Sequence, residues 1–180
     1  MSEFVAFNKI SRLSRECVVT EKIDGTNASI TITDAGEFLV GSRTRWITPT
    51  DDNYGFAKWA HANKEELMKL GPGQHFGEWW GLGIQRGYSQ TIKKFSLFNT
   101  ARWSNDGIRP LCCGVVPVLY MGLFDTDEVK KAVNRLAHFG SSAAPGFAKP
   151  EGVVVYHQAA RIYFKKTIEK DEEWKGKEKS

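Results

Sequence analysis

Short segments of alternating or β-branched apolar residues recur along the chain, and this pattern is typical of β-strands. The segments cover residues 17–21, 28–33, 38–41, 74–80, 95–99, 117–124, 152–157 and 161–165. Ala35 and Gly36 favour a tight turn between the second and third segments, which predicts a hairpin there.

Two other segments repeat apolar residues every three or four positions, as one face of a helix does. The first is preceded by Asp51 and Asp52, which are suitable helix caps, and ends at Gly71-Pro72-Gly73. Its face is apolar at all but one of the following positions: Phe56, Trp59, Asn63, Leu67 and Leu70.

The second helical segment begins at residues 125–128, where an acidic residue stands three positions after a capping aspartate. Gly140 is expected to end it. Its predicted buried face consists of Val129, Val133, Leu136 and Ala137. Strands outnumber helices and neighbours are joined by short turns, so the sequence predicts an α+β domain with antiparallel sheets.

The length of 180 residues fits one domain with a substantial core. No apolar run reaches the ~18–20 residues of a membrane-spanning helix, and the N-terminus lacks the apolar core of a signal peptide. We therefore expect no membrane contact and a cytoplasmic location, in the host cell if the chain is of phage origin. The charged tail at residues 169–180 is expected to be solvated and helical or irregular.

Composition adds little about partners. The net charge of +4 is compatible with a polyanionic partner, but it is weak evidence because clustering is not visible in a sequence. Three cysteines, two of them adjacent, are not a disulfide framework. The four histidines are far apart and no zinc-ligand spacing occurs, so a zinc site is not expected.

The segment Glu21-Lys22-Ile23-Asp24-Gly25-Thr26-Asn27 places a lysine where a strand ends and a glycine turn begins. Such a position holds a side chain rigidly and exposes its tip to a ligand. A lysine amine attacks an electrophile only when it is unprotonated. The alternative is an exposed turn lysine beside a common Asp-Gly turn.

Two carboxylates stand in apolar surroundings. Glu78 lies within the strand FGEWW, and Glu151 precedes the apolar strand GVVVY. A buried carboxylate needs a partner or a ligand, and either residue could bind a metal ion. The alternative for Glu78 is the solvent face of an edge strand.

Aromatic and basic residues complete the candidate set. Phe95 and Phe98 could stack on a purine, although a role in the core is the alternative. Lys165 and Lys166 are adjacent on a strand, so they point to opposite faces and only one is expected to reach a bound phosphate. Arg86, in the glycine-rich turn 81–87, could contact phosphate or form a structural ion pair.

The ordered series KIDGTN, SR, FGEWWG, FSLFN, PEGVVVY and YFKK resembles the motifs of covalent nucleotidyltransferases, the superfamily of ATP-dependent DNA and RNA ligases and capping enzymes. The stretch FGEWWGLGIQRGY is most similar to phage-type RNA ligases. The resemblance spans roughly residues 21–166. It implies a nucleotidyltransferase domain whose antiparallel sheets are flanked by helices, with the ATP pocket between them.

The resemblance also implies residue roles. Lys22 would be the catalytic residue that attacks ATP and carries AMP. Glu78 and Glu151 would contact the nucleotide and a metal, Mg²⁺ or Mn²⁺. The other residues expected to contact ATP are Glu21, Asn27, Arg43, Phe98, Lys165 and Lys166. The family's last motif usually separates its two lysines by one residue, whereas they are adjacent here; Lys165 is our first choice, with Tyr163 or Phe164 in place of the first lysine.

The predicted function is ATP-dependent joining of a 5′-phosphate end to a 3′-hydroxyl end, with RNA favoured over DNA. DNA nick sealing, capping-type guanylyl transfer and a non-catalytic nucleic-acid-binding module are the alternatives. Residues 1–180 are expected to form a single adenylyltransferase domain with no OB-fold or other C-terminal domain. The chain is expected to be a monomer, unless a partner protein supplies that missing domain.

Overall fold

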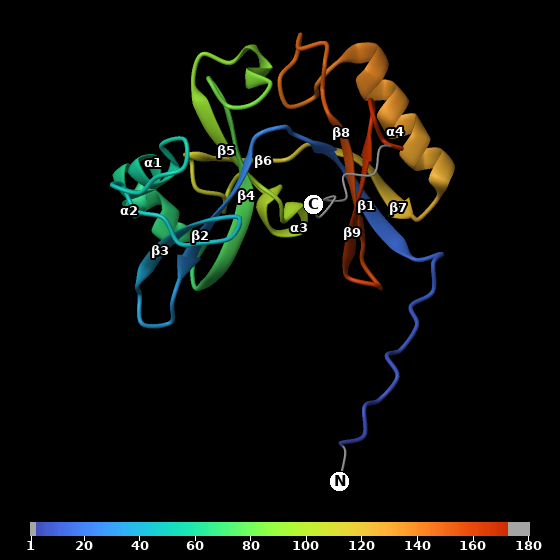
Figure 1. The fold of residues 1–180 in the computed structure, drawn as a ribbon, viewed down its shortest axis with the longest axis horizontal. Helices are drawn as coiled ribbons and strands as arrows, with labels where there is room; N and C mark the ends of the chain where they lie inside the picture. Colours follow the sequence, from blue (N-terminus) through green and yellow to red (C-terminus); the bar gives the residue numbers. More distant parts are fainter. Residues whose placement is uncertain (1–2, 173–180) are drawn as a thin grey trace, which may run out of the picture.

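The computed structural model describes residues 3–172, which form two β-sheets standing side by side (Figure 1). The five-stranded sheet has the order β3 (Phe38–Ser42), β2 (Thr26–Ile32), β4 (Gly73–Gly81), β5 (Lys93–Leu97), β6 (Cys113–Val115). The four-stranded sheet has the order β7 (Val118–Leu123), β1 (Glu16–Lys22), β8 (Gly152–His157), β9 (Ile162–Thr167). Neighbouring strands are antiparallel except for β5 and β6. The predicted α+β class with antiparallel sheets is confirmed.

One face of the five-stranded sheet is covered by short helices: α1 (Phe56–Ala62), α2 (Lys64–Leu67), the 3-10 turn η1 (Met68–Leu70) and α3 (Thr100–Trp103). The core between them is aromatic. Phe56 lies 5.3 Å from Trp79 and 5.0 Å from Phe95, centroid to centroid. Full burial of side chains of this size stabilises a fold by about 1.5–3 kcal/mol each.

The four-stranded sheet packs against α4 (Thr126–Phe139), which covers its outer face in Figure 1. Asp125 caps this helix through a 2.7 Å bond from the Asp127 N–H, as the sequence predicted. The predicted buried positions Val129, Val133 and Leu136 are confirmed. The prediction that Ala137 is buried was wrong, because Ala137 faces solvent. Ala132, about one turn earlier, completes the apolar stripe instead.

The single helix predicted after residue 52 is interrupted. Asp52 does cap it, since its carboxylate accepts from the Ala57 and Lys58 N–H groups, but the helix begins only at Phe56. It breaks at Asn63, whose side-chain amide donates to the Trp59 carbonyl at 2.8 Å. Asparagine competes in this way for helical hydrogen bonds, so the one polar residue of the predicted stripe is where the helix ends.

The predicted strands are found with shifts of at most two residues at their ends. The largest error is at residues 95–99, because Asn99 leaves the strand and caps α3 through its side-chain oxygen. β6 and α3 were not predicted, since each is too short to show a period. The tail predicted at 169–180 falls outside the described residues from position 173 onward. Within residues 3–172, no helix is long and apolar enough to cross a membrane.

The chain passes from one sheet to the other directly after β1. The turn Ile23-Asp24-Gly25 connects Lys22, the last residue of β1, to Thr26, the first residue of β2. Lys22 therefore stands at the junction of the two sheets, where side chains from both can reach it.

Candidate active site

Lys22 and Glu151 form the centre of the site. Lys22 is paired with Gly152 in the β1–β8 register, so the residue before β8 lies beside it. The Lys22 Nζ is 2.5 Å from Glu151 Oε2, and the two side chains are 25% and 18% exposed. This is a partly buried ion pair whose nitrogen is still accessible to a ligand.

Glu78 reaches the same place from the other sheet. Its Oε1 accepts a hydrogen bond of 3.0 Å from the Gly25 N–H, within the turn that follows Lys22. Burial raises the pKa of the Glu78 carboxyl from its ordinary value of 4.5 to about 7, against the opposing effects of the Lys22 ammonium and the Gly25 N–H. Glu78 is thus a partly buried carboxylate whose charge its surroundings compensate only in part.

The turn itself requires glycine. A Cβ on Gly25 would lie 2.5 Å from the Trp79 carbonyl oxygen and 2.8 Å from the Trp80 Cβ. The absence of a side chain therefore allows the turn to lie close against β4, which brings Glu78 to Lys22. Asn27 is paired with Glu78 in the β2–β4 register, so their side chains point to the same face.

Glu21 lies on the face of β1 opposite to Lys22, because successive strand residues alternate. It is 1% exposed. Its carboxylate accepts from Ser141 Oγ at 2.6 Å and from the Ser142 and Ala143 N–H groups at 2.8 Å each. These bonds fix the loop after α4 to β1. The expected ATP contact at Glu21 is not what its side chain does here, since both oxygens are already engaged within the protein.

The two aromatic candidates, Phe95 and Phe98, lie in different parts of the fold. Phe95 is 1% exposed in the core beneath the helices, where it packs against Phe56. Phe98 follows β5 and is partly buried in a second cluster that contains Ile23, the residue after Lys22. Of the two, only Phe98 packs against the cluster that contains the residue after Lys22.

The two adjacent lysines point to opposite faces of β9, as expected. Lys165 is paired with Val154, and Val154 with Thr20, two residues before Lys22. Lys165 therefore lies on the same sheet face as Lys22. Lys166 lies on the opposite face, where its Nζ is 2.8 Å from Asp171 Oδ2.

Arg43 is less closely tied to the site. It is exposed in the turn after β3, and no hydrogen bond or ion pair among the described residues joins it to Lys22, Glu78 or Glu151.

Arg86, for which the sequence left open a phosphate contact or a structural ion pair, forms an ion pair of 3.0 Å with Asp24. Sequence reasoning missed Tyr88, which bonds to the same turn; a tyrosine in a glycine-rich segment gives no signal of burial.

The protein groups at the site fit a divalent ion only in part. No cluster of three or more His, Cys, Asp or Glu side chains suited to a metal occurs within residues 3–172. Glu78 and Glu151 supply two carboxylates beside Lys22. Mg²⁺ is commonly held by one or two carboxylates together with substrate phosphates and water, so this pair fits an ion that arrives with a nucleotide.

Comparison with protein families establishes the family to which the chain belongs. The model of the RNA ligase family matches residues 15–170, nearly all of the described chain. The chain belongs to the RNA ligase family. The matched residues include Lys22, Glu78, Glu151 and Lys165. A search of curated proteins gives no match.

Solved structures agree with the family assignment. This RNA ligase domain is similar to an apo mutant of Naegleria gruberi RNA ligase, with 25% identity, a TM-score of 0.61, and coverage of 86% of this chain and 50% of that one. A Naegleria gruberi RNA ligase mutant with ATP and Mn gives 24% identity, a TM-score of 0.62 and coverage of 86% and 50%. The same ligase with PPi gives 20% identity, a TM-score of 0.61 and coverage of 93% and 57%.

The chain thus spans about half the length of these ligases. The nucleotidyltransferase fold of the RNA ligases is present, with two antiparallel sheets meeting at the lysine.

Proposed function

We propose that this protein is an ATP-dependent RNA ligase in which Lys22 carries AMP covalently. One observation supports the proposal most strongly. The Lys22 amine lies 2.5 Å from Glu151 at a junction where Glu78 arrives from a separate sheet. An exposed turn lysine would not be placed between two partly buried carboxylates, one of which has a raised pKa.

In the first step, the Lys22 Nζ attacks the α-phosphorus of ATP. An N–P bond forms, the bond from the α-phosphorus to the bridging oxygen breaks, and pyrophosphate leaves with that oxygen. The amine must lose its proton, and the Glu151 carboxylate is the acceptor within hydrogen-bond distance. Lys165, on the same sheet face, is the cation suited to contact the α-phosphate.

Phe98 is the aromatic side chain suited to stack on adenine, since it is partly buried beside Ile23. Glu78 and Glu151 would hold a divalent ion together with the nucleotide phosphates. Such an ion, when bound, would offset the negative charge that develops on the phosphates. It would also compensate the charge of the partly buried Glu78 carboxylate. Naegleria gruberi RNA ligase, solved with ATP and Mn, is the precedent for both ligands.

In the second step, AMP passes from Lys22 to a 5′-phosphate: the N–P bond breaks and a pyrophosphate linkage forms. In the third step, a 3′-hydroxyl attacks that activated phosphate and AMP leaves. RNA is the favoured substrate because the chain belongs to the RNA ligase family. Since the chain spans about half of the solved ligases, we further propose that a separate segment or partner protein strengthens the grip on RNA ends.

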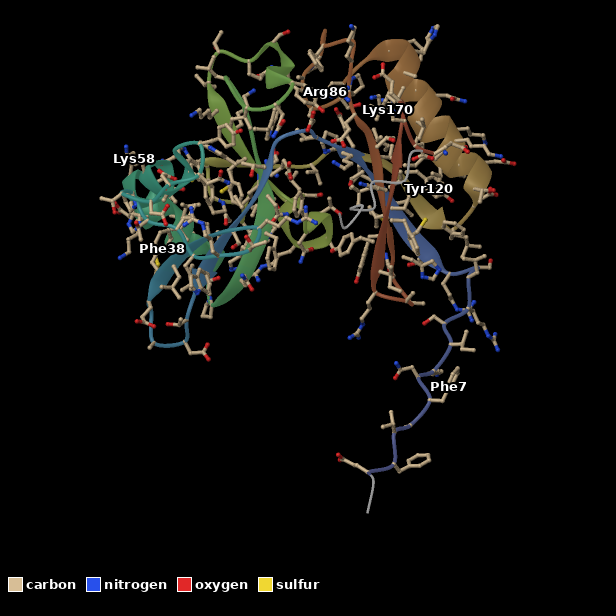
Figure 2. All side chains as sticks on the ribbon, in the orientation of Figure 1. Phe7, Phe38, Lys58, Arg86, Tyr120 and Lys170 are labelled. Atoms are coloured by element: carbon tan, nitrogen blue, oxygen red, sulfur yellow. The ribbon has the colours of Figure 1, made fainter. Side chains whose placement is uncertain are left out.

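Covalent labelling tests this proposal. The protein is incubated with ATP or GTP labelled on the α-phosphate, with Mg²⁺ or Mn²⁺, and protein-bound label is measured. We expect labelling by ATP, stable to alkali and lost in acid, in the unmodified chain and in Lys58→Ala, whose lysine lies exposed on α1 (Figure 2). Lys22→Ala should not label. Labelling by GTP alone would indicate guanylyl transfer, and no labelling by either would indicate a non-catalytic module.

A further inference from the structure

Tyr88 has an unusual backbone and an unusual position. It is fully buried, yet its φ is 50°, in the left-handed region that side chains with a Cβ rarely adopt. Two neighbours share this conformation, Gln85 with φ 46° and Ser89 with φ 54°. Such strain persists only where the surrounding contacts determine it, and it concentrates at functional sites.

The contacts of Tyr88 point to the nucleophile. Its hydroxyl oxygen accepts a hydrogen bond of 2.9 Å from the N–H of Asp24, two residues after Lys22. The Tyr88 phenol is therefore hydrogen-bonded to the turn that follows the lysine.

The Tyr88 ring is held as firmly as its hydroxyl. It packs against Phe147 with a centroid distance of 4.5 Å and edge-on against Trp80 at 5.4 Å. Phe147 belongs to the loop that is tied to β1 through the buried Glu21 carboxylate. The β1 strand end is thus fastened on one side through Glu21 and on the other through Tyr88.

Arg86 makes a parallel connection from the same segment. Its Nε lies 3.0 Å from Asp24 Oδ2, and its Nη1 donates to the carbonyls of Lys149 at 2.8 Å and Pro150 at 3.3 Å. Figure 2 places Arg86 between the two sheets. Arg86 therefore links the turn after Lys22 to the entry of β8, and Tyr88 binds the same turn.

We propose that Tyr88, assisted by Arg86, is a positioning residue that fixes the Lys22 amine in line with its phosphorus target. The inference rests on the proposed function. It yields a step-specific expectation, because Lys22 forms the N–P bond in the first step and loses it in the second, but shares no bond in the third. Loss of positioning should slow the first two steps and spare the sealing of an RNA that already carries a 5′-adenylate.

The test removes the hydroxyl and keeps the ring. Tyr88→Phe is compared with Tyr120→Phe, a control on β7 in which the lost hydroxyl bonds to the Leu123 carbonyl at 2.8 Å (Figure 2). Tyr120 packs against the cluster beneath α4, on the sheet face opposite to Lys22. Single-turnover adenylylation is measured over a range of ATP concentrations, and sealing is measured with a pre-adenylylated RNA. We expect Tyr88→Phe to lower the saturating adenylylation rate by about tenfold or more, since misplacement of a reacting group is costly.

In the same variant, half-saturation by ATP and sealing of pre-adenylylated RNA should stay within about twofold, because neither involves attack by Lys22. Equal losses in adenylylation and sealing, or no loss in either, would overturn the inference. If Tyr88→Phe does not fold, Arg86→Gln tests the inference instead, because Arg86 is partly exposed. This variant should also show slower adenylylation with unchanged sealing of pre-adenylylated RNA. Absence of adenylylation in the unmodified chain would refute the proposed function, which is a separate outcome.

Discussion

Replacing Glu78 by glutamine should stabilise the protein at alkaline pH while removing its activity. Burial raises the folded-state pKa of this carboxyl to about 7, from an ordinary value of 4.5. The folded protein therefore binds the Glu78 proton more tightly than the unfolded chain does. It follows that the contribution of Glu78 to stability is greatest below pH 4.5, declines as the pH rises to about 7, and is constant above that.

The gap between these two pKa values corresponds to roughly 3 kcal/mol lost on ionisation. Because the side chain is not completely buried, about 2–3 kcal/mol is the realistic range. Glutamine cannot ionise, has nearly the same shape, and keeps an oxygen for the Gly25 N–H. The charged neighbours of Glu78, namely Lys22, Asp24 and Glu151, are unchanged in the variant.

The assay is urea unfolding followed by tryptophan fluorescence, at about pH 5 and about pH 8, for the original chain, Glu78→Gln and the exposed control Glu37→Gln. We expect Glu78→Gln to gain about 1.5–2 kcal/mol relative to the original chain between the two pH values, since part of the loss has already occurred at about pH 5, and Glu37→Gln to gain almost nothing. Parallel pH dependence of all three proteins would refute the reasoning, as would a loss of stability in Glu78→Gln at the higher pH.

Three further predictions follow from the site. Lys165→Ala should lower the rate of adenylylation by about a hundredfold, because a cation facing the α-phosphate is lost, and Lys166→Ala should change it by less than about threefold; similar rates for the two variants in a single-turnover labelling assay would contradict the assignment of faces. Glu21→Ala should destabilise the fold by about 3 kcal/mol in urea unfolding, because three donors lose a buried acceptor, whereas Glu16→Ala at the exposed start of β1 should have little effect; equal stabilities would argue against the clamp. Chelation of divalent ions should stop adenylylation, and added Mg²⁺ or Mn²⁺ should restore it; full labelling in excess chelator would exclude a required metal.

The local pattern of apolar residues predicted the positions of most strands. The alternation of apolar residues located β8 at residues 152–157 without error, and it located β1 to within one residue at each end. This accuracy matters for function, because a register shifted by one residue would move Lys22 to the α4 face and Glu21 to the site. The same alternation separated Lys165 from Lys166.

Sequence patterns do not show side-chain contacts between residues that are far apart along the chain. Asn63 interrupts a helix through a side-chain bond that an apolar spacing cannot reveal. Glu21 directly precedes Lys22 in sequence, yet its side-chain partners lie about 120 positions away, in the loop after α4. Tyr88 bonds to a turn 64 positions earlier, from a backbone conformation that its residue type disfavours. Long-range pairing of this kind is visible only once the two sheets are placed together.

Mass spectrometry of the ATP-treated protein tests the central proposal most directly. The protein is digested under alkaline conditions after incubation with ATP and a divalent ion, and fragmentation locates any adenylyl group on a single residue. We predict one adduct, on Lys22, at the junction of the two sheets. An adduct on another residue, or none in a correctly folded protein, would contradict the account.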